Sequence, residues 1–246
     1  MSKASDFRAL HEAPELLVLV NVWDVASAKV VAGLPGCQAI ATASHAVATS
    51  FGYPDGEHLP ADLMLETVRR IAAAVDLPVT ADLEAGYGDV ATTVRQAVDA
   101  GVVGANIEDA NIPFGEAVAR MEAAVKAGGP DFVLNARTDQ FLGGPNDVDE
   151  AIRCGRAFLD VGADCVFVPG VTDVETIGRL VQGIGRSKVS LMGMPQMPPQ
   201  EELQALGVAR LSFGPWPHRA ALTALADSGA ALLGGGALPT TVRALS

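Results

Sequence analysis

Short apolar runs alternate along the chain with longer segments in which apolar residues recur every three or four positions. The apolar runs predict buried strands at residues 16–22, 38–43, 78–82, 104–109, 132–139, 164–170, 189–194 and 211–213. The longer segments predict helices at residues 25–34, 61–75, 90–100, 148–161, 174–184, 199–206 and 218–233, with one more that ends at Lys126. Because strands and helices alternate, the chain is predicted to consist of parallel βαβ units.

Eight such units in 246 residues predict one (β/α)₈ barrel domain that spans residues 1–246. No break in composition and no Pro/Ser-rich linker marks a second domain. An open, doubly wound sheet is the competing architecture, but no G-x-G-x-x-G motif follows the first predicted strand. If the barrel is correct, the active site lies where the strands end, at their carboxyl termini.

The charge of the chain restricts its partners. It carries 17 Lys and Arg against 29 Asp and Glu, a net charge of −12, which argues against binding to nucleic acid or to an anionic membrane. Cys37, Cys154 and Cys165 are widely spaced, as in a reduced intracellular protein. Residues 1–13 lack the apolar core of a signal peptide, and no apolar run reaches the ~18 residues of a membrane span. We therefore expect a cytoplasmic protein.

Polar residues gather where the predicted strands end. Asp82 and Glu84 follow the third strand, and strand alternation would place both on one face; Gly86 and Gly88 then permit a tight turn. The other polar strand ends are Asn21-Val-Trp-Asp24, Thr42-Ala-Ser-His45, Asn106-Ile-Glu-Asp109 and Asn135-Ala-Arg-Thr-Asp139. Acids that converge on one mouth are costly without a cation, so we expect Mg²⁺ with retained waters, or Mn²⁺ in its place.

Arg137 would add a planar fork for a carboxylate or phosphoryl group to this mouth. Taken singly, Glu108 and Arg137 are typical of a structural ion pair, and it is the recurrence of polar ends over three strands that favours function. Ser44 and His45 would point apart as neighbours on a strand, which argues against a catalytic triad. His45 is a candidate for acid–base chemistry or for a loop cap, and Trp216 is predicted to pack.

Two other mechanisms find little support. A Schiff-base aldolase needs a desolvated lysine, yet no lysine lies at the carboxyl end of a predicted strand. A zinc site needs grouped His or Cys side chains, and the four histidines are scattered. The lysines are Lys3, Lys29, Lys126 and Lys188, and the histidines are His11, His45, His58 and His218.

These motifs, in this order and spacing, resemble the isocitrate lyase / phosphoenolpyruvate mutase superfamily. The resemblance is carried by Asn21-Val-Trp-Asp24, Gly52-Tyr-Pro-Asp-Gly56, Asp82-Leu-Glu-Ala-Gly-Tyr-Gly88, Asn106-Ile-Glu-Asp109 and Asn135-Ala-Arg-Thr-Asp139. It implies a (β/α)₈ barrel, often a homodimer or homotetramer whose last helix is swapped between subunits. It also implies small anionic 2-oxo or 2-hydroxy acid substrates and an enolate intermediate stabilised by Mg²⁺.

The resemblance also implies roles for single residues. The metal would be held at Asp82, with Asp55, Glu84 and Glu108 acting directly or through waters. Arg137, Glu108 and His45 are the catalytic candidates. The substrate-binding candidates are Trp23, Ala43, Ser44, His45 and Arg137.

Two departures from the superfamily pattern concern the reaction. The gating loop of the superfamily's carbon–carbon lyases carries a Cys in a Lys-Cys-Gly-His type sequence, whereas this chain reads Asn111-Ile-Pro-Phe-Gly-Glu116 and enters the next helix directly. The superfamily's Ser-Gly step is here Ala43-Ser44. The usual proton donor is therefore missing, and a closing lid is short or absent.

Three functional hypotheses follow. The first is a Mg²⁺-dependent lyase that acts on a small 2-oxo or 2-hydroxy di-acid by C–C cleavage or decarboxylation. The second is P–C bond chemistry of the phosphoenolpyruvate mutase or phosphonopyruvate hydrolase type. The third is a non-catalytic barrel that binds a metal and a 2-oxo acid without turnover.

Overall fold

Nine parallel strands form a nearly closed barrel in the computed structural model, which describes residues 2–245. Each strand pairs in parallel with its neighbours in the order β1-β9-β8-β7-β6-β5-β4-β3-β2. The strands are β1 Leu17–Leu19, β2 Asn21–Val22, β3 Ile40–Thr42, β4 Val79–Asp82, β5 Gly104–Glu108, β6 Val133–Arg137, β7 Cys165–Phe167, β8 Val189–Met192 and β9 Arg210–Ser212. The predicted barrel architecture is confirmed.

The strand count differs from the prediction because the first apolar run is divided in two. β1 pairs with β9, and after Val20 the chain continues as β2, which pairs with β3. Asn21 lies at this junction and bridges it, because its side-chain oxygen accepts hydrogen bonds from the backbone N–H groups of Phe213 and Gly214 while its amide donates to Thr42 O. Residues 17–22 thus pair with both β9 and β3, the two neighbouring strands that would otherwise be the edges of the sheet.

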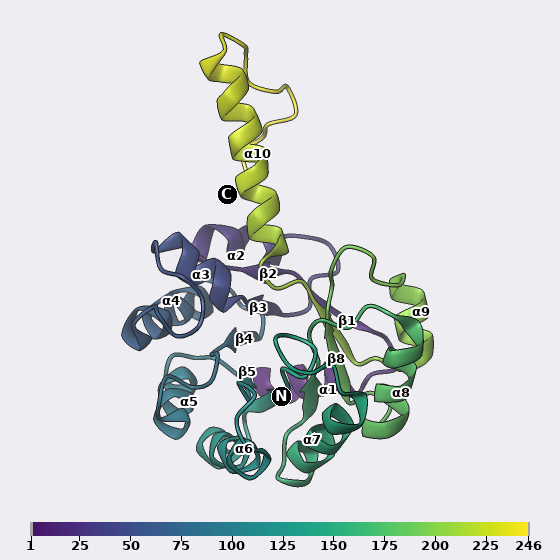
Figure 1. Cartoon of the computed structure of the whole chain (residues 1–246). Coiled ribbons are helices and arrows are strands. Elements are labelled where there is room, and N and C mark those ends of the chain that lie inside the picture. The colour runs from purple at the N-terminus through teal and green to yellow at the C-terminus, as the bar shows by residue number, and fades with distance from the viewer. Residues whose placement is uncertain (1, 246) are drawn as a thin grey trace.

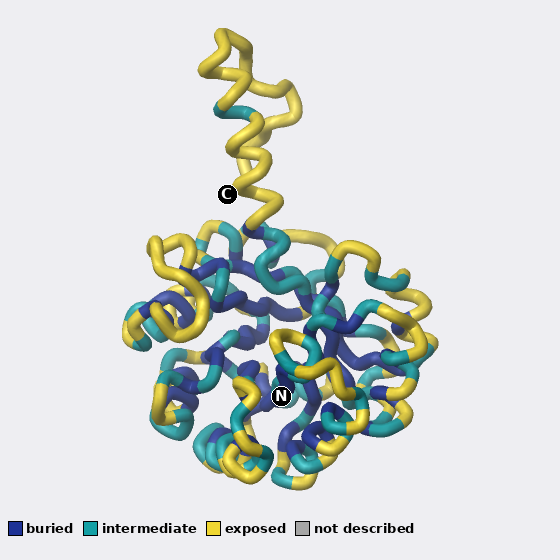
Figure 2. The backbone as a smooth tube through the Cα atoms, viewed as in Figure 1, coloured by how far each residue is buried: buried dark blue, intermediate teal, exposed yellow. Residues whose placement is uncertain are grey.

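Helices surround the barrel in the cartoon (Figure 1). Four of them begin at an aspartate N-cap (Asp24, Asp89, Asp147 and Asp173) whose carboxylate accepts from a backbone N–H of the first turn. Their apolar faces pack on the outward faces of the strands, so most strand residues are buried (Figure 2). The helices are α1 Lys3–Glu12, α2 Val25–Ala32, α3 Ser44–Ser50, α4 Ala61–Ala74, α5 Val90–Asp99, α6 Phe114–Gly128, α7 Val148–Asp160, α8 Val174–Ile184, α9 Gln200–Leu206 and α10 Trp216–Leu233.

Helix α1, which the sequence pattern did not reveal, covers the amino-terminal end of the barrel. Phe7 is fully buried against Leu17, Leu19 and Val133, and a Cβ on Gly104 would come within 3.0 Å of its ring. His11 lies one turn later, with Nδ1 2.9 Å from Phe7 O and its ring edge-on to the Phe7 ring. The helix therefore plugs the barrel at the end opposite the polar strand ends.

Helix α10 leaves the barrel and extends away from it (Figure 1). Only its first turn is tied to the barrel, where His218 is buried against Trp23. Most of the remaining helix is exposed (Figure 2), including the apolar side chains of Leu222, Leu225, Leu232 and Leu233. No helix among residues 2–245 is both long and apolar enough to cross a bilayer.

Burial of His11 makes stability sensitive to acid. Burial, reinforced by the charge of Arg210, lowers the pKa of His11 from 6.5 to about 3. Below pH 6.5, His11 is protonated in the unfolded chain but stays neutral in the folded chain. His11 therefore lowers the free energy of unfolding more and more as the pH falls from 6.5 towards 3. In the His11→Gln variant we expect this loss, on the order of 3 kcal/mol at pH 4, to disappear. Urea unfolding of both proteins from pH 7 to pH 4 measures it; parallel pH profiles would contradict the assignment.

Candidate active site

Asp82 ends β4 at the rim of the barrel. Its Oδ2 accepts hydrogen bonds from the Ser44 backbone N–H (3.1 Å) and the Ser44 hydroxyl (2.8 Å), and its own N–H donates to Thr42 Oγ1 (3.0 Å). Its Oδ1 is buried and has no hydrogen-bond partner in the described part of the chain. A buried carboxylate oxygen without a partner is costly. This atom is therefore well suited to ligate a cation.

Ser44 and His45 converge on a second acid, Asp55. Ser44 Oγ lies 3.4 Å from Asp55 Oδ1, and His45 Nδ1 lies 3.5 Å from Asp55 Oδ2. The prediction that these two side chains point apart is wrong, because β3 ends at Thr42 and Ser44 is the first residue of α3. Successive residues on a helix are turned by about 100°, so both side chains reach the loop that carries Asp55.

Arg137 ends β6 and is held between two acids. Its Nη1 lies 2.8 Å from Glu108 Oε2, and its Nε donates to Asp139 Oδ1 at 2.6 Å. Register explains the first contact, because Glu108 and Arg137 are paired positions of β5 and β6. Burial opposes the charge of Arg137, but the two acids together raise its pKa. Burial raises the pKa of Glu108 and of Asp139, and Arg137 counteracts this in both.

Glu84 does not share the strand face of Asp82, because β4 has already ended. Glu84 has a φ of 51° and directs its carboxylate into the loop, where the Tyr87 hydroxyl (2.7 Å) and the Glu57 backbone N–H donate to it. Burial raises the pKa of Glu84, and the charges of Asp82 and Asp55 raise it further. Gly86 is required in this turn, since its φ is 97° and a Cβ there would lie 2.7 Å from Val90 Cβ.

An amide network with a buried cation forms the floor beneath the rim. Arg210 is 1% exposed, and its Nη2 lies 3.3 Å from Asn106 Oδ1, to which Asn135 Nδ2 also donates (2.8 Å). Because a guanidinium can only donate, the Asn106 atom that faces it must be the oxygen. Asn106 Nδ2 is then the amide donor that remains available to the cavity above.

The rim and floor enclose a cavity of about 310 Å³. Of the predicted site residues, Ala43, Ser44, His45, Asp55, Asp82 and Arg137 line it together. Glu84 and Glu108 do not line the cavity; Glu108 supports Arg137, whereas Glu84 is bound by Tyr87 and the Glu57 backbone in the loop. Trp216, predicted only to pack, does line the cavity. The sequence analysis did not identify the apolar lining residues Leu142, Phe167, Pro169, Met192 and Met194. The apolar carboxyl ends of β7 and β8 could have indicated all of these except Leu142.

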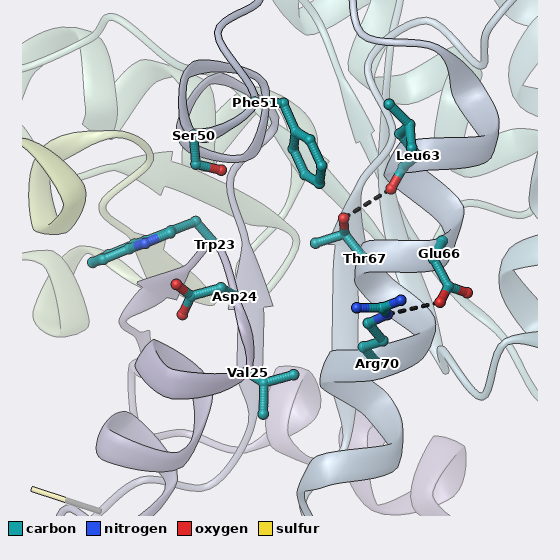
Figure 3. Close-up of a pocket in the computed structure, with 9 residues that line it drawn as sticks. All are labelled: Trp23, Asp24, Val25, Ser50, Phe51, Leu63, Glu66, Thr67 and Arg70. Carbon is teal, nitrogen blue, oxygen red and sulfur yellow. Dashed lines mark hydrogen bonds and ion pairs between the residues drawn. The ribbon is translucent and has the colours of Figure 1, made fainter.

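Trp23 is placed elsewhere. It lines a separate cavity of about 410 Å³ among α2, α3 and α4, together with Asp24, Phe51 and Arg70 (Figure 3). In that view Arg70 is paired with Glu66, and Asp24 lies beside Trp23. The structure thus does not bring Trp23 into the cavity of Asp82.

The donor set fits a cation that is bound mainly through water. In the described chain, no group of three or more His, Cys, Asp or Glu side chains lies close enough to form a ready-made metal cage. Mg²⁺ usually binds proteins through one or two carboxylates and keeps several waters. The unpartnered Oδ1 of Asp82, with Asp55 on the same cavity, is of this kind.

The region expected to carry a gating loop is short. Only five residues separate the end of β5 at Glu108 from the start of α6 at Phe114, and Arg120 of that helix donates to Glu108 O (2.9 Å). Neither Cys154 nor Cys165 lines the cavity, and burial raises the pKa of both thiols to about 12. Neither is therefore suited to serve as the proton donor.

Removing Arg137 should destabilise the protein, because it leaves two buried acids without a positive partner. In the Arg137→Met variant, Glu108 and Asp139 lose their partner, and we expect the free energy of unfolding to fall by about 3 kcal/mol at pH 8. The loss should be smaller at pH 5, because both acids can then take up a proton. The matched control is Arg179→Met, whose exposed pair with Asp149 should contribute less than about 1 kcal/mol. Equal losses in urea unfolding would contradict this account.

Known proteins share this barrel and its sequence. The family model described as phosphoenolpyruvate phosphomutase matches residues 7–233. The uncharacterized protein Rv1998c of Mycobacterium tuberculosis is 34% identical, with 96% of this chain and 92% of that protein covered. The oxaloacetate decarboxylase of Ectopseudomonas mendocina is 32% identical, with 91% of this chain and 82% of that protein covered.

Solved structures agree with these matches. The structure of oxaloacetate acetylhydrolase in complex with the product oxalate superposes with a TM-score of 0.87 at 28% identity, and 97% of this chain and 89% of that one are covered. Together with the match of the family model over most of the barrel, this confirms the resemblance that the motifs suggested. The chain belongs to the phosphoenolpyruvate phosphomutase family, within the isocitrate lyase / phosphoenolpyruvate mutase superfamily of enzymes.

Proposed function

We propose that this chain is a Mg²⁺-dependent carbon–carbon lyase that acts on a small 2-oxo or 2-hydroxy di-acid through an enolate of the pyruvate type. The observation that carries the proposal is the unpartnered Oδ1 of Asp82 beside a cavity that Arg137 also lines. A cation ligand and a carboxylate-binding fork thus meet on one small cavity. Relatives named oxaloacetate decarboxylase and oxaloacetate acetylhydrolase act, by their names, on an acid of this class.

Asp82 would hold the metal directly, and Asp55, on the same cavity, would act directly or through water. Glu84 and Glu108 do not line the cavity, so they would act only through waters. When bound, Mg²⁺ or Mn²⁺ would supply the positive charge that stabilises an enolate oxygen. The Ser44 hydroxyl and backbone N–H keep the Asp82 carboxylate oriented by donating to Oδ2. Its other oxygen, Oδ1, is thereby left for the cation.

Arg137 orients the substrate carboxylate in this proposal. Glu108 and Asp139 occupy its Nη1 and Nε, which leaves Nη2 to donate into the cavity. Because the two acids lock the guanidinium plane, little side-chain freedom is lost when substrate binds. Asn106 Nδ2, aimed by Arg210 and Asn135, would provide a neutral donor from the floor.

Proton transfer falls to His45 or to water. His45 lines the cavity, and its Nδ1 lies 3.5 Å from Asp55 Oδ2, which helps to position the ring. Decarboxylation makes the smallest demand on this site, since loss of CO₂ leaves the electron pair as the enolate and needs no base. His45 or water then returns one proton to carbon, which completes the reaction without a gating loop.

Turnover can be tested with a panel of 2-oxo and 2-hydroxy acids. We expect release of pyruvate or glyoxylate from at least one di-acid in the presence of Mg²⁺, with loss of more than about 100-fold in the Asp82→Ala variant because the cation ligand is gone. EDTA should abolish the activity, and added Mg²⁺ should restore it. Rates that equal those of Asp82→Ala across the panel would refute the proposal. Mg²⁺-dependent oxalate binding without turnover would instead select a non-catalytic binding barrel.

P–C bond chemistry is the second candidate, because the matching family model is described as phosphoenolpyruvate phosphomutase. Arg137 could hold a phosphoryl group as well as a carboxylate. The two reactions differ in what happens to phosphorus. Incubation with phosphonopyruvate, followed by ³¹P NMR, separates phosphate release or rearrangement from an unchanged signal.

We further propose that α10 pairs with a second copy of the chain, in a homodimer or homotetramer. Leu225 is 67% exposed and Leu233 is 93% exposed on a helix that leaves its own barrel. Apolar side chains so arranged favour a protein partner.

Charge placed on α10 should disrupt this assembly. We expect wild-type protein to run as an oligomer in size-exclusion chromatography with light scattering, and Leu225→Glu to shift it towards the monomer because the apolar contact gains a desolvated charge. Thr223→Glu places the same charge on the opposite face of α10 and should leave the mass unchanged. A monomeric wild-type protein would contradict the proposal.

A further inference from the structure

The mouth of the barrel is divided into two chemically different halves. Apart from Arg219 of α10, the charged and amide side chains that line the cavity come from β2 to β6 and the adjoining segments, as with Asp82 and Arg137. The ends of β7 and β8 contribute no charge at all. There the lining consists of Phe167, Met192 and Met194, with Leu142 from the loop after β6. We call these four residues the apolar wall.

Nothing on this wall could compensate a carboxylate. Among residues 2–245, the arginines that line the cavity are Arg137 and Arg219. Arg137 stands on the polar half, where Glu108 and Asp139 already bind it. Arg219 is exposed, and its guanidinium lies over the Trp216 ring, 5.0 Å from the centroid. An anionic group that met the apolar wall would lose its hydration without gaining a partner, which is unfavourable.

Three of the four wall residues are not fully buried in the hydrophobic core, although Phe167 is buried. Leu142 is 43% exposed, and Met192 and Met194 are only partly buried, so apolar surface is left facing the cavity. By contrast, Leu191, which precedes Met192 in β8, is fully buried. Exposed apolar side chains that gather on one side of a cavity are typical of a site for an apolar part of a ligand.

We propose that the substrate carries a short alkyl substituent that packs against the apolar wall, while its acid groups stay on the polar half beside Asp82 and Arg137. The inference rests on the proposed function, because it assumes that a 2-oxo or 2-hydroxy acid head occupies the polar half. It names the substrate class more closely: an alkyl-substituted small acid rather than one with a further carboxylate on this side. A cavity of about 310 Å³ has room for such an acid and a group of a few carbons.

Unreactive oxamates can test this with the full-length protein in Mg²⁺. Oxamate and its N-methyl, N-ethyl, N-propyl and N-isobutyl derivatives share one 2-oxo acid head and differ only in the alkyl tail. Calorimetry should show affinity rising about threefold per added carbon until the cavity is full. N-Oxalylglycine has the same head, but its tail ends in a carboxylate of nearly the shape of isobutyl. We expect it to bind at least tenfold more weakly than N-isobutyl oxamate.

Variants of Met194 locate the effect on the wall. Met194→Gln keeps the length of the side chain but makes it polar, so the gain along the alkyl series should shrink while affinity for oxalate stays within about twofold. Met194→Lys supplies the missing positive charge and should reverse the order, so that N-oxalylglycine binds more tightly than N-isobutyl oxamate. Met197→Gln is the matched control, since Met197 belongs to the same loop but does not line the cavity. It should behave like the wild type.

The outcomes separate the two proposals. If neither oxalate nor oxamate binds in the presence of Mg²⁺, the site does not recognise the 2-oxo acid head group, and the proposed function is refuted. If oxalate binds and requires Asp82, but affinity is flat along the alkyl series, the apolar wall is not a substrate subsite and this inference alone is overturned. Tighter binding of N-oxalylglycine than of N-isobutyl oxamate by the wild type overturns it equally.

Discussion

Every strand of this barrel runs in the same direction, and the chemistry of the molecule depends on that one constraint. Parallel pairing places the carboxyl ends of β2 to β9 on a single rim, so residues far apart in sequence become neighbours. Glu108 and Arg137 illustrate the effect, because they are separated by a whole helix yet are paired positions of adjacent strands. The opposite end, covered by α1, holds Phe7 and a His11 whose pKa is too low for it to be charged at neutral pH.

Several acids on one rim repel one another, and the positive charges and hydrogen-bond donors that compensate them are distributed unequally among them. Glu108 and Asp139 share one guanidinium, and Glu84 relies on hydrogen bonds from Tyr87 and the backbone. Asp82 is satisfied at one oxygen only. Where compensation is complete, the side chain acts as a support, and where it is incomplete, it is available to a ligand. This difference separates the residues that hold the cavity from those that face it.

Periodicity predicts the alternation of strands and helices because burial of one face is a local property of sequence. The bounds of α8 are predicted to the residue, and Asp24 caps α2 as its position suggests. What periodicity could not reveal is where a strand stops. The assumption that alternation continues beyond Thr42 and Asp82 led to wrong orientations for Ser44, His45 and Glu84, since a new helix begins at the first site and a residue with positive φ lies at the second. Such breaks are set by tertiary hydrogen bonds rather than by the local pattern.

Arg210 shows how a residue with no signal in the apolar pattern can govern the site. It is the first residue of β9, and burial lowers its pKa to about 10, which still leaves it charged at neutral pH. The charge of Asp82 acts in the other direction and stabilises that cation. A buried arginine below the cavity therefore offsets part of the negative charge of the rim above it, and it also fixes the Asn106 amide through a donor-only contact. A site floored in this way can accept an anionic ligand, because some of the positive charge that the ligand requires is already built into the barrel.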